Sequence, residues 1–292
     1  MRVVKVYPGG VAMSGGNNHA VPPVGVKRGK IAGWSSDAAS RHVAWLMSVD
    51  PSAFPEGTAM WGYTLTVGTL PATAADFHLM RRAWLKRVER ALPGTKWCWV
   101  MEWQKRGAPH LHGVLVVPDT AESTKALAQL VYGGWCEVAI STDALPVAQD
   151  LRQADRISGW LQYLSKHIGR GSKHMQRKAG MMPPGWASSG RLWGHSQGWP
   201  TAEEKLFIDT RAWFELRRLV HAWALADAKS EKDPAVRSRR VKYLKHRRQL
   251  RLEVSRHVGL REWAPPHVMA ELLTWCTTQG FDVVNAETGE LR

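Results

Sequence analysis

Residues 99–115 read WVMEWQKRGAPHLHGVL, and this stretch decides the fold that we expect for the chain. Apolar residues alternate with polar or small ones on both sides of residues 105–109, which hold the Gly and Pro of a turn-type loop. The pattern predicts two strands, over 97–104 and 110–117. A loop this short joins antiparallel neighbours, so we expect a hairpin here.

The hairpin carries a set of side chains with metal-ligand chemistry. Alternate residues of a strand share a face, so His110 and His112 point the same way, as Glu102 and Gln104 do. If the loop closes symmetrically, Gln104 lies opposite His110 and Glu102 lies opposite His112. One carboxylate and two imidazoles then converge, which predicts a divalent-metal site suited to Mn²⁺, Mg²⁺ or Zn²⁺. The alternative is a chance His-x-His pair on a half-exposed strand.

A second candidate element is the helix expected over 157–168, which contains Tyr163 and Lys166. Residues three apart share a helix face, so the phenol and the ammonium lie together. A tyrosine becomes a competent nucleophile when its proton is drawn away and its target phosphate is polarised. The alternative interpretation is that Tyr163 packs in the core and Lys166 is a solvated charge.

The flanking periodicities predict an α+β fold, with a central antiparallel sheet, flanking helices and a C-terminal helical appendage. The expected helices are 35–49, 73–92, 120–130, 157–168, 202–230, 235–258 and 268–279, and the further strands are 60–67 and 136–140. We expect three parts: an N-terminal arm and helix over 1–57, the sheet domain over 58–200, and a basic helical region over 201–292. The Gly- and Pro-rich residues 1–33 are the expected arm.

The composition restricts the partners. Lys and Arg number 40 against 25 Asp and Glu, a net charge of +15, which favours a polyanionic partner, nucleic acid first and an anionic membrane surface second. Three scattered cysteines exclude a disulfide framework and a Cys-rich zinc site. No apolar run is long enough to cross a membrane and no signal peptide is apparent, so we expect a protein of the bacterial cytoplasm.

Two segments concentrate the positive charge. Residues 151–200 carry eight Lys or Arg against one acid, and the helix at 235–258 carries nine against one. A DNA strand lying across the tyrosine helix accounts for the first cluster. For the second, contact with duplex DNA and a solvated basic helix that merely docks remain equally open.

The chain has 16 tryptophans, which can stack on bases or fill a core. Three alternate on the strand face away from Glu102, and we expect them to pack under a helix. Three others follow the tyrosine helix in a loop-rich region and are better stacking candidates. The first set is Trp97, Trp99 and Trp103, and the second is Trp186, Trp193 and Trp199.

Together these motifs resemble the His-hydrophobic-His (HUH) endonucleases that initiate rolling-circle replication of plasmids and single-stranded DNA phages. The resemblance covers most of residues 60–195 and is especially close to phage gene II-type replication proteins around Gln104 and Arg106 to His112. The matching positions are Tyr63–Thr66 for the first motif, Glu102 with His110–His112 for the metal motif, Tyr163–Lys166 for the nucleophile motif, and Gly190–Gly194 for an Arg-x-Trp-Gly element.

The resemblance implies a mechanism for an endonuclease domain over 58–200. A divalent ion, Mn²⁺ or Mg²⁺, held by Glu102, His110 and His112 would polarise the scissile phosphate, and Tyr163 would attack it with Lys166 orienting the phenol or offsetting charge. The enzyme would keep a 5′-phosphotyrosine link and release a 3′-OH for a host polymerase. The reverse reaction would join the ends.

The resemblance and the charge clusters also imply partners: single-stranded DNA, an origin hairpin, and the host helicase and polymerase, with no membrane and a possible oligomer. The residues expected to bind DNA lie at the hairpin tip, after the tyrosine, and on the basic helix. They are Gln104, Arg106, Arg170, Lys173, Arg177, Lys178, Arg191, Trp193, Arg239, Arg240, Lys245, Arg247 and Arg248.

The chain departs from some relatives at the nucleophile. Those relatives carry two neighbouring tyrosines, whereas positions 164 and 167 here are Leu and His, so the joining step needs a second subunit or reuse of Tyr163. No nucleotide-binding P-loop motif indicates a fused helicase. Alternatives are a transposase or a mobilisation relaxase with the same chemistry, although a relaxase usually has its tyrosine near the N-terminus. A non-enzymatic DNA- or RNA-binding regulator with a vestigial metal site is a further alternative.

Overall fold

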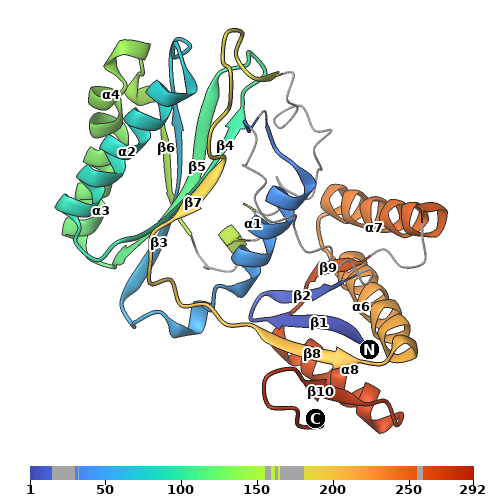
Figure 1. Cartoon of the computed structure of the whole chain (residues 1–292). Coiled ribbons are helices and arrows are strands. Elements are labelled where there is room, and N and C mark those ends of the chain that lie inside the picture. The colour runs from blue at the N-terminus through green and yellow to red at the C-terminus, as the bar shows by residue number, and fades with distance from the viewer. Residues whose placement is uncertain (15–29, 32, 155–158, 162–163, 165–180, 255–258) are drawn as a thin grey trace. The chain divides into compact units, whose positions relative to one another are not determined.

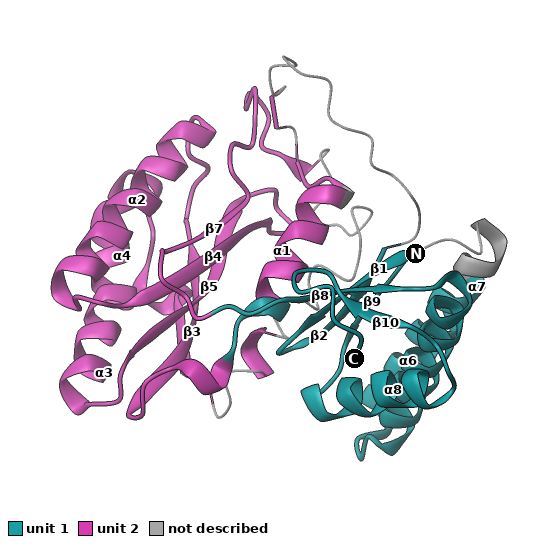
Figure 2. Ribbon diagram, turned by 60° about the horizontal axis from the view of Figure 1, so that its bottom comes forward, with its two compact units in different colours: residues 1–24, 47–50, 201–292 teal, residues 25–46, 51–200 magenta. Residues whose placement is uncertain are grey.

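A computed structural model describes the chain apart from residues 15–29, 32, 155–158, 162–163, 165–180 and 255–258 (Figure 1). The described chain forms two compact units (Figure 2). Unit 1 comprises residues 1–24, 47–50 and 201–292, and unit 2 comprises residues 25–46 and 51–200. Unit 2 is therefore inserted between two segments that fold together as unit 1.

Unit 2 is built on a five-stranded sheet in the order β6-β3-β5-β4-β7, with antiparallel pairing between neighbours. Its helices α2, α3 and α4 lie on one face of this sheet, and α1 lies on the other (Figure 1). The bounds are α1 Ser36–Ser48, β3 Thr58–Thr66, α2 Ala74–Ala91, β4 Lys96–Trp103, β5 Pro109–Pro118, α3 Ala121–Ala128, α4 Trp135–Val138, β6 Asp150–Gln153 and β7 Trp193–His195.

The α2 helix shows how local sequence sets the layers. Thr73 caps its N-terminus in a capping box with Asp76, which satisfies backbone N–H groups that the first turn leaves without partners. Gly94, with φ of 83°, follows the helix end in the left-handed region that glycine adopts without strain. The apolar stripe of α2, including Phe77 and Trp84, is fully buried against the sheet and α4.

The strand expected over 136–140 is wrong. A π-helix at Gln129–Gly134 continues into α4, and the Ala139 N–H donates to the Trp135 carbonyl as in a helix. The buried Trp135 ring packs edge-on against Phe77 and Trp84 of α2. Tertiary packing of one aromatic side chain thus decides a short segment whose alternation resembles that of a strand.

Unit 1 has its own five-stranded sheet, in the order β10-β8-β1-β2-β9. Buried apolar side chains of the sheet pack against helices α6 and α8, and α7 packs on α6 through Leu244, Ala224 and Ala228. The bounds are β1 Arg2–Tyr7, β2 Gly10–Met13, β8 Glu204–Ile208, α6 Thr210–Ser230, α7 Pro234–Val254, β9 Leu260–Trp263, α8 Pro266–Thr278 and β10 Val283–Asn285.

Two expectations about the ends of the chain are therefore wrong. Residues 2–13 are not an arm but a hairpin, in which Tyr7 pairs with Gly10 across the two-residue turn of Pro8 and Gly9. Residues 201–292 are not purely helical, because β8 precedes α6, and β9 and β10 complete the sheet. The Val-rich strand β1 is central, between β2 and β8, so the three expected parts do not coincide with the two units.

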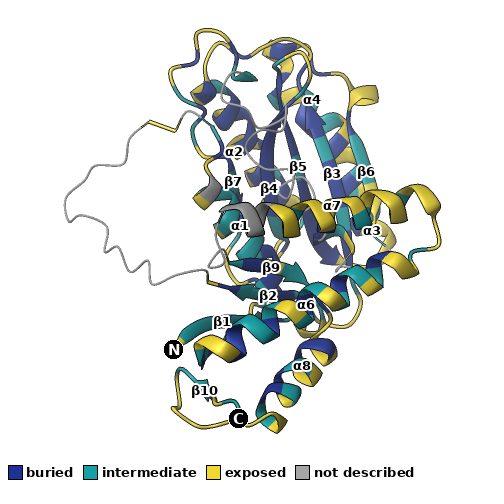
Figure 3. Ribbon diagram, turned by 90° about the vertical axis from the view of Figure 1, so that its right-hand side faces the viewer, coloured by how far each residue is buried: buried dark blue, intermediate teal, exposed yellow. Residues whose placement is uncertain are grey.

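Burial follows this architecture (Figure 3). The strands of both sheets are largely buried, whereas α7 is exposed along much of its length. In the part of the chain that the structure describes, no helix is long and apolar enough to cross a membrane. The α+β prediction is confirmed by the two sheets and their helices.

Candidate metal centre and DNA-binding surface

The three predicted metal ligands come together on β4 and β5, on the face of the unit 2 sheet away from α2. Glu102 lies directly opposite His110, and His112 lies two residues further along β5, opposite Val100. Directly opposite side chains point to the same face of a sheet. The predicted convergence of one carboxylate and two imidazoles is present.

The pairing register differs from the expected one by two residues. Gly107, with φ of 82°, donates its N–H to the Gln104 carbonyl, and the Gln104 N–H donates to the Ala108 carbonyl. The tip is thus a tighter turn than a loop over 105–109, so Trp103 rather than Gln104 pairs with the residue at the start of β5. A shift by two residues keeps every side chain on its predicted face, which is why the site survives the error.

The spacing of the donor atoms fits a small cation. One ligand atom each from Glu102, His110 and His112 lie within 4.8 Å of one another, and the two Nε2 atoms are 3.0 Å apart. Neighbouring ligands of an octahedral ion with bonds of about 2.1 Å are about 3.0 Å apart, whereas tetrahedral ligands would be about 3.4 Å apart. These residues could hold an octahedral divalent ion such as Mg²⁺ or Mn²⁺.

Thr64 on β3 orients one of the ligands. Its Oγ1 lies 2.9 Å from His112 Nδ1, and Thr64 pairs directly with His112 across the strands. With Nδ1–H donating to this oxygen, Nε2 keeps its lone pair and faces Glu102 and His110. Sequence reasoning gave Thr64 no role, although residues 63–66 were singled out as a motif.

The opposite face of the sheet is closed by α2. The Arg81 guanidinium lies 3.7 Å from the Trp99 ring centroid, and the Tyr63 hydroxyl donates to the Cys98 carbonyl. Burial lowers the pKa of Arg81 to about 10 and raises the pKa of Tyr63 well above its usual value. Trp99 packs under a helix as expected, and Tyr63 is a core residue that cannot act as a nucleophile.

Two elements cover the ligand-bearing face. On α1, His42 stacks on Trp193 with centroids 4.8 Å apart, and Trp45 stacks on His195 at 4.3 Å. Trp193 pairs with Val100, so it shares the face of His112. On the β3 side, a Cβ on Gly62 would meet the Trp160 ring at 2.3 Å, which places helical residues 159–161 on the same face.

The expected stacking tryptophans are mostly used inside the protein. Trp186 is 5% exposed and donates its indole N–H to the Pro71 carbonyl, and Trp199 is 7% exposed. Trp193 is half-buried in the aromatic cluster with His42. Neither Trp186 nor Trp199 offers a ring for stacking on DNA, since packing and hydrogen bonding already occupy them.

Several predicted residues fall outside the described residues. These are Tyr163, Lys166, Arg170, Lys173, Arg177 and Lys178. Nearby, the described helical positions Leu161 and Leu164 are buried, and Arg191 is exposed.

Gln104 and Arg106 form part of a cavity at the hairpin tip. Arg106 Nε donates to Gln104 Oε1 at 2.8 Å, and the guanidinium also donates to the Val67 and Gly68 carbonyls. A cavity of about 360 Å³ lies here, between the end of β3, the hairpin tip and residues 143–148. Arg106 therefore has a structural role that its sequence context did not reveal, in holding the hairpin tip to the end of β3.

The predicted DNA-binding residues of α7 fall into two groups. Arg240 pairs with Asp227 and Glu231, and Arg247 pairs with Glu262 at 3.1 Å. Arg239, Lys245 and Arg248 are exposed. Only the exposed group is placed to meet a partner, because the paired arginines fix α7 within unit 1.

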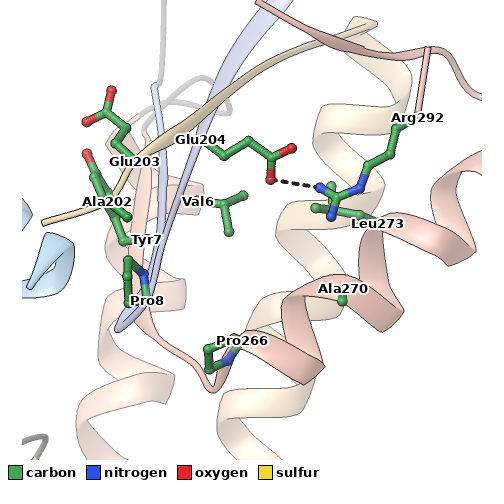
Figure 4. A pocket seen from close by; sticks show the side chains of 10 residues that line it. All are labelled: Val6, Tyr7, Pro8, Ala202, Glu203, Glu204, Pro266, Ala270, Leu273 and Arg292. Atoms are coloured by element: carbon green, nitrogen blue, oxygen red, sulfur yellow. Dashed lines mark hydrogen bonds and ion pairs between the residues drawn. The ribbon is translucent and has the colours of Figure 1, made fainter. Parts of the chain in front are cut away.

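A second cavity, of about 330 Å³, lies in unit 1 (Figure 4). Its lining includes Tyr7, Leu273 and the ion pair between Glu204 and Arg292, whose atoms are 2.9 Å apart. None of the predicted site residues lines it.

Comparisons with known proteins agree with the geometry. The family model for replication-associated proteins of the ORF2 and gene II protein type matches residues 61–177, which include all three candidate ligands. The chain is 34% identical over 257 residues to the replication-associated gene II protein of Pseudomonas phage Pf3, covering 87% of this chain and 89% of the relative.

Two proteins of Xylella fastidiosa are similar over nearly their whole length. "Putative replication protein XF_b0001" of strain 9a5c is 35% identical over 302 aligned positions, covering 98% of this chain and 100% of the relative. "Putative replication protein PDa0002" of strain Temecula1 is 37% identical over 279 positions, covering 90% and 99%. No solved structure matches. The chain therefore belongs to the family of replication-associated gene II proteins.

Proposed function

We propose that this protein initiates rolling-circle replication by nicking single-stranded DNA at an origin, with Tyr163 as the nucleophile. The observation that carries the proposal is the convergence of Glu102, His110 and His112 on one sheet face, in a chain of a replication-associated family. This face is the one against which the described part of the predicted tyrosine helix packs, through Trp160 and Gly62.

Glu102, His110 and His112 would hold Mn²⁺ or Mg²⁺, which when bound supplies Lewis-acid polarisation of the scissile phosphate. Glu102 is 1% exposed, so its carboxylate acts where electrostatic interactions are strong. His110 is 7% exposed, and Thr64 fixes the ring of His112. A preorganised, partly buried ligand set holds its geometry without help from the substrate.

In the proposed step the phenolic oxygen of Tyr163 attacks phosphorus and forms a 5′-phosphotyrosine ester. The bond between phosphorus and the 3′ oxygen breaks, the phenol proton goes to solvent, and the leaving oxygen gains a proton to become a 3′-OH. Lys166, three residues on, offers positive charge to the phosphate. Attack by a 3′-OH on the phosphotyrosine reverses the step and joins the ends.

The proposed partners follow from this chemistry. The exposed basic residues contact single-stranded DNA and an origin hairpin, a host helicase separates the strands, and a host polymerase extends the 3′-OH. The chain acts on DNA in the bacterial cytoplasm. A net charge of +15 supports a polyanionic partner.

Covalent capture tests the proposal. Purified protein is incubated with Mn²⁺ and a randomised single-stranded DNA library, and adducts that resist denaturation are recovered and sequenced. We expect an adduct that chelation of the metal prevents and that Tyr163→Phe abolishes. The matched control is Tyr132→Phe, at a 36% exposed tyrosine of the π-helix, which should form the adduct normally.

The metal ligands have their own test. His110→Ala and His112→Ala should abolish the adduct and leave much of the DNA affinity, because phosphate contacts elsewhere supply most of the binding. Normal cleavage by either variant would show that the ligands are wrongly assigned. DNA binding without any adduct would identify a regulator instead, and joining of captured DNA to unrelated target DNA would identify a transposase or relaxase.

A further inference from the structure

The cavity at the hairpin tip lies beside the candidate metal centre. Thr66 lines it and pairs directly with His110 across β3 and β5, so its wall is one cross-strand pair from a ligand. Directly opposite Cβ atoms are about 4.5–5.5 Å apart. The volume of about 360 Å³ is at the small end of ligand pockets, which span roughly 300–1,000 Å³. It suits a single small ligand group.

The walls of the cavity are built rather than incidental. The buried side chain of Gln149 accepts the Thr66 N–H at 2.7 Å and donates to the Leu145 carbonyl at 2.7 Å, which holds residues 143–148 beside β3. On the other side, Arg106 ties the hairpin tip to the carbonyls of Val67 and Gly68. Both walls are thus held by hydrogen bonds to the end of β3.

The rim combines apolar surface with a strained carboxylate residue. Leu145 lines the cavity although its side chain is 59% exposed, and Val147 beside it is 89% exposed. Asp143, with φ of 51°, is the one non-glycine residue with positive φ in the described chain. Strained backbone and exposed apolar side chains are both concentrated at binding sites.

We propose that this cavity binds one nucleobase of the single-stranded substrate, next to the scissile phosphodiester. The inference rests on the proposed function and names a recognition site for it. Leu145 and Val67 offer apolar contact to the base, and Asp143 can accept a hydrogen bond from its edge. Because Gln104 Oε1 accepts from Arg106, the amide nitrogen is the end of Gln104 that can donate to the base.

A thermodynamic cycle between protein and DNA tests the proposal. The probe is the consensus oligonucleotide from the covalent capture, or the consensus from filter binding to the same library if no adduct forms. Each position near the nick is made abasic in turn, and the nicking rate and the Kd are measured for wild type and for Leu145→Ser. The matched control is Val147→Ser, an exposed apolar residue two positions away that does not line the cavity.

We expect a single abasic position to weaken wild type by about tenfold or more, in line with the stacking contribution of one base. Leu145→Ser should weaken the intact oligonucleotide similarly and show little further loss at that position, since both changes remove one contact. Val147→Ser should behave as wild type.

Additive effects of Leu145→Ser and every abasic position would overturn the proposal, as would equal losses in Val147→Ser. A wild-type protein that never nicks contradicts the proposed function, but the cycle in Kd still decides whether the cavity takes a base.

Discussion

His78 on α2 is a buried imidazole whose Nε2 lies 2.9 Å from the Ser189 carbonyl. Burial, reinforced by the neighbouring Arg81 charge, lowers its pKa from 6.5 to about 4. Gly190, with φ of 64°, lets the backbone approach this ring, since a Cβ there would meet Nε2 at 2.5 Å. The ring therefore stays neutral in the folded protein while it charges in the unfolded chain.

The His78 environment predicts acid sensitivity. Between pH 6.5 and about 4 the unfolded chain binds more protons, so the free energy of unfolding decreases as the pH falls through this window. The shift corresponds to about 3 kcal/mol, fully present above pH 6.5. His78→Gln, which keeps an N–H donor but does not titrate, should flatten this part of the stability profile in denaturant titrations.

The exposed His267 gives the control, because His267→Gln should leave the profile unchanged. A His78→Gln profile as steep as that of wild type would show that other groups cause the acid sensitivity.

At this scale the sequence was informative where side-chain period decides the answer. Alternation alone placed Glu102, His110 and His112 on one face, and this is what the structure has. Thr64 was not predicted as the partner of His112, because the contact depends on which strand lies beside β5. Such cross-strand neighbours are set by topology, which no local pattern contains.

Among the elements, the β4–β5 hairpin depends on its turn. Gly107 adopts φ of 82°, a conformation that costs other residues about 1 kcal/mol or more. Gly107→Ala should lower the free energy of unfolding by about that amount, measured by chemical denaturation.

Gly133 is the matched control for the hairpin turn. It lies in the π-helix, where an added Cβ meets nothing within 4 Å, so Gly133→Ala should stabilise the protein by about 0.4–1 kcal/mol. Two Gly→Ala changes of the same sign would contradict the assigned turn geometry.

The α7 helix predicts a separation of DNA binding from stability. Replacing Arg239, Lys245 or Arg248 by Ala should reduce the slope of log K against log salt by about 1 for each phosphate that the side chain neutralises. Arg240→Ala should instead lower the melting temperature with the slope unchanged, because Arg240 pairs with Asp227. Equal slopes for all four variants would show that α7 is a solvated helix that does not touch DNA.

Long periodic elements were predictable, and short ones were not. The α2 helix was expected over 73–92 and spans Ala74–Ala91, since its cap and stripe are local signals. The 136–140 segment was misassigned because the burial of Trp135 against α2 decides its conformation. The hairpin register failed by two residues because turn geometry, not loop length, fixes it.

In the whole molecule, unit 1 is assembled from both ends of the chain. Central strand β1 pairs with β2 on one side and β8 on the other, and Val4 of β1 is fully buried in the core. Sequence patterns within 1–33 or 201–292 could not reveal this sheet, because each segment holds only some of its strands. The Pro8–Gly9 turn was instead taken for part of an arm.

This arrangement predicts that a change near the N-terminus unfolds the C-terminal segment. Val4→Asp buries a charge without compensation, so limited proteolysis should begin to cleave within residues 201–292. Lys5→Asp, on the half-exposed opposite face of the same strand, is the control and should leave cleavage unchanged. Continued protection of residues 201–292 in Val4→Asp would contradict the central role of β1.

The split sheet also bears on how the protein is made. Strands β1 and β2 leave the ribosome first, but β8 begins only at Glu204, after the whole of unit 2. At about 5–20 residues per second, roughly 10–40 s of translation separate β2 from its sheet partners. During that time the nascent hairpin presents open edges, so its two edges depend on the speed of synthesis and on chaperones for protection from mispairing.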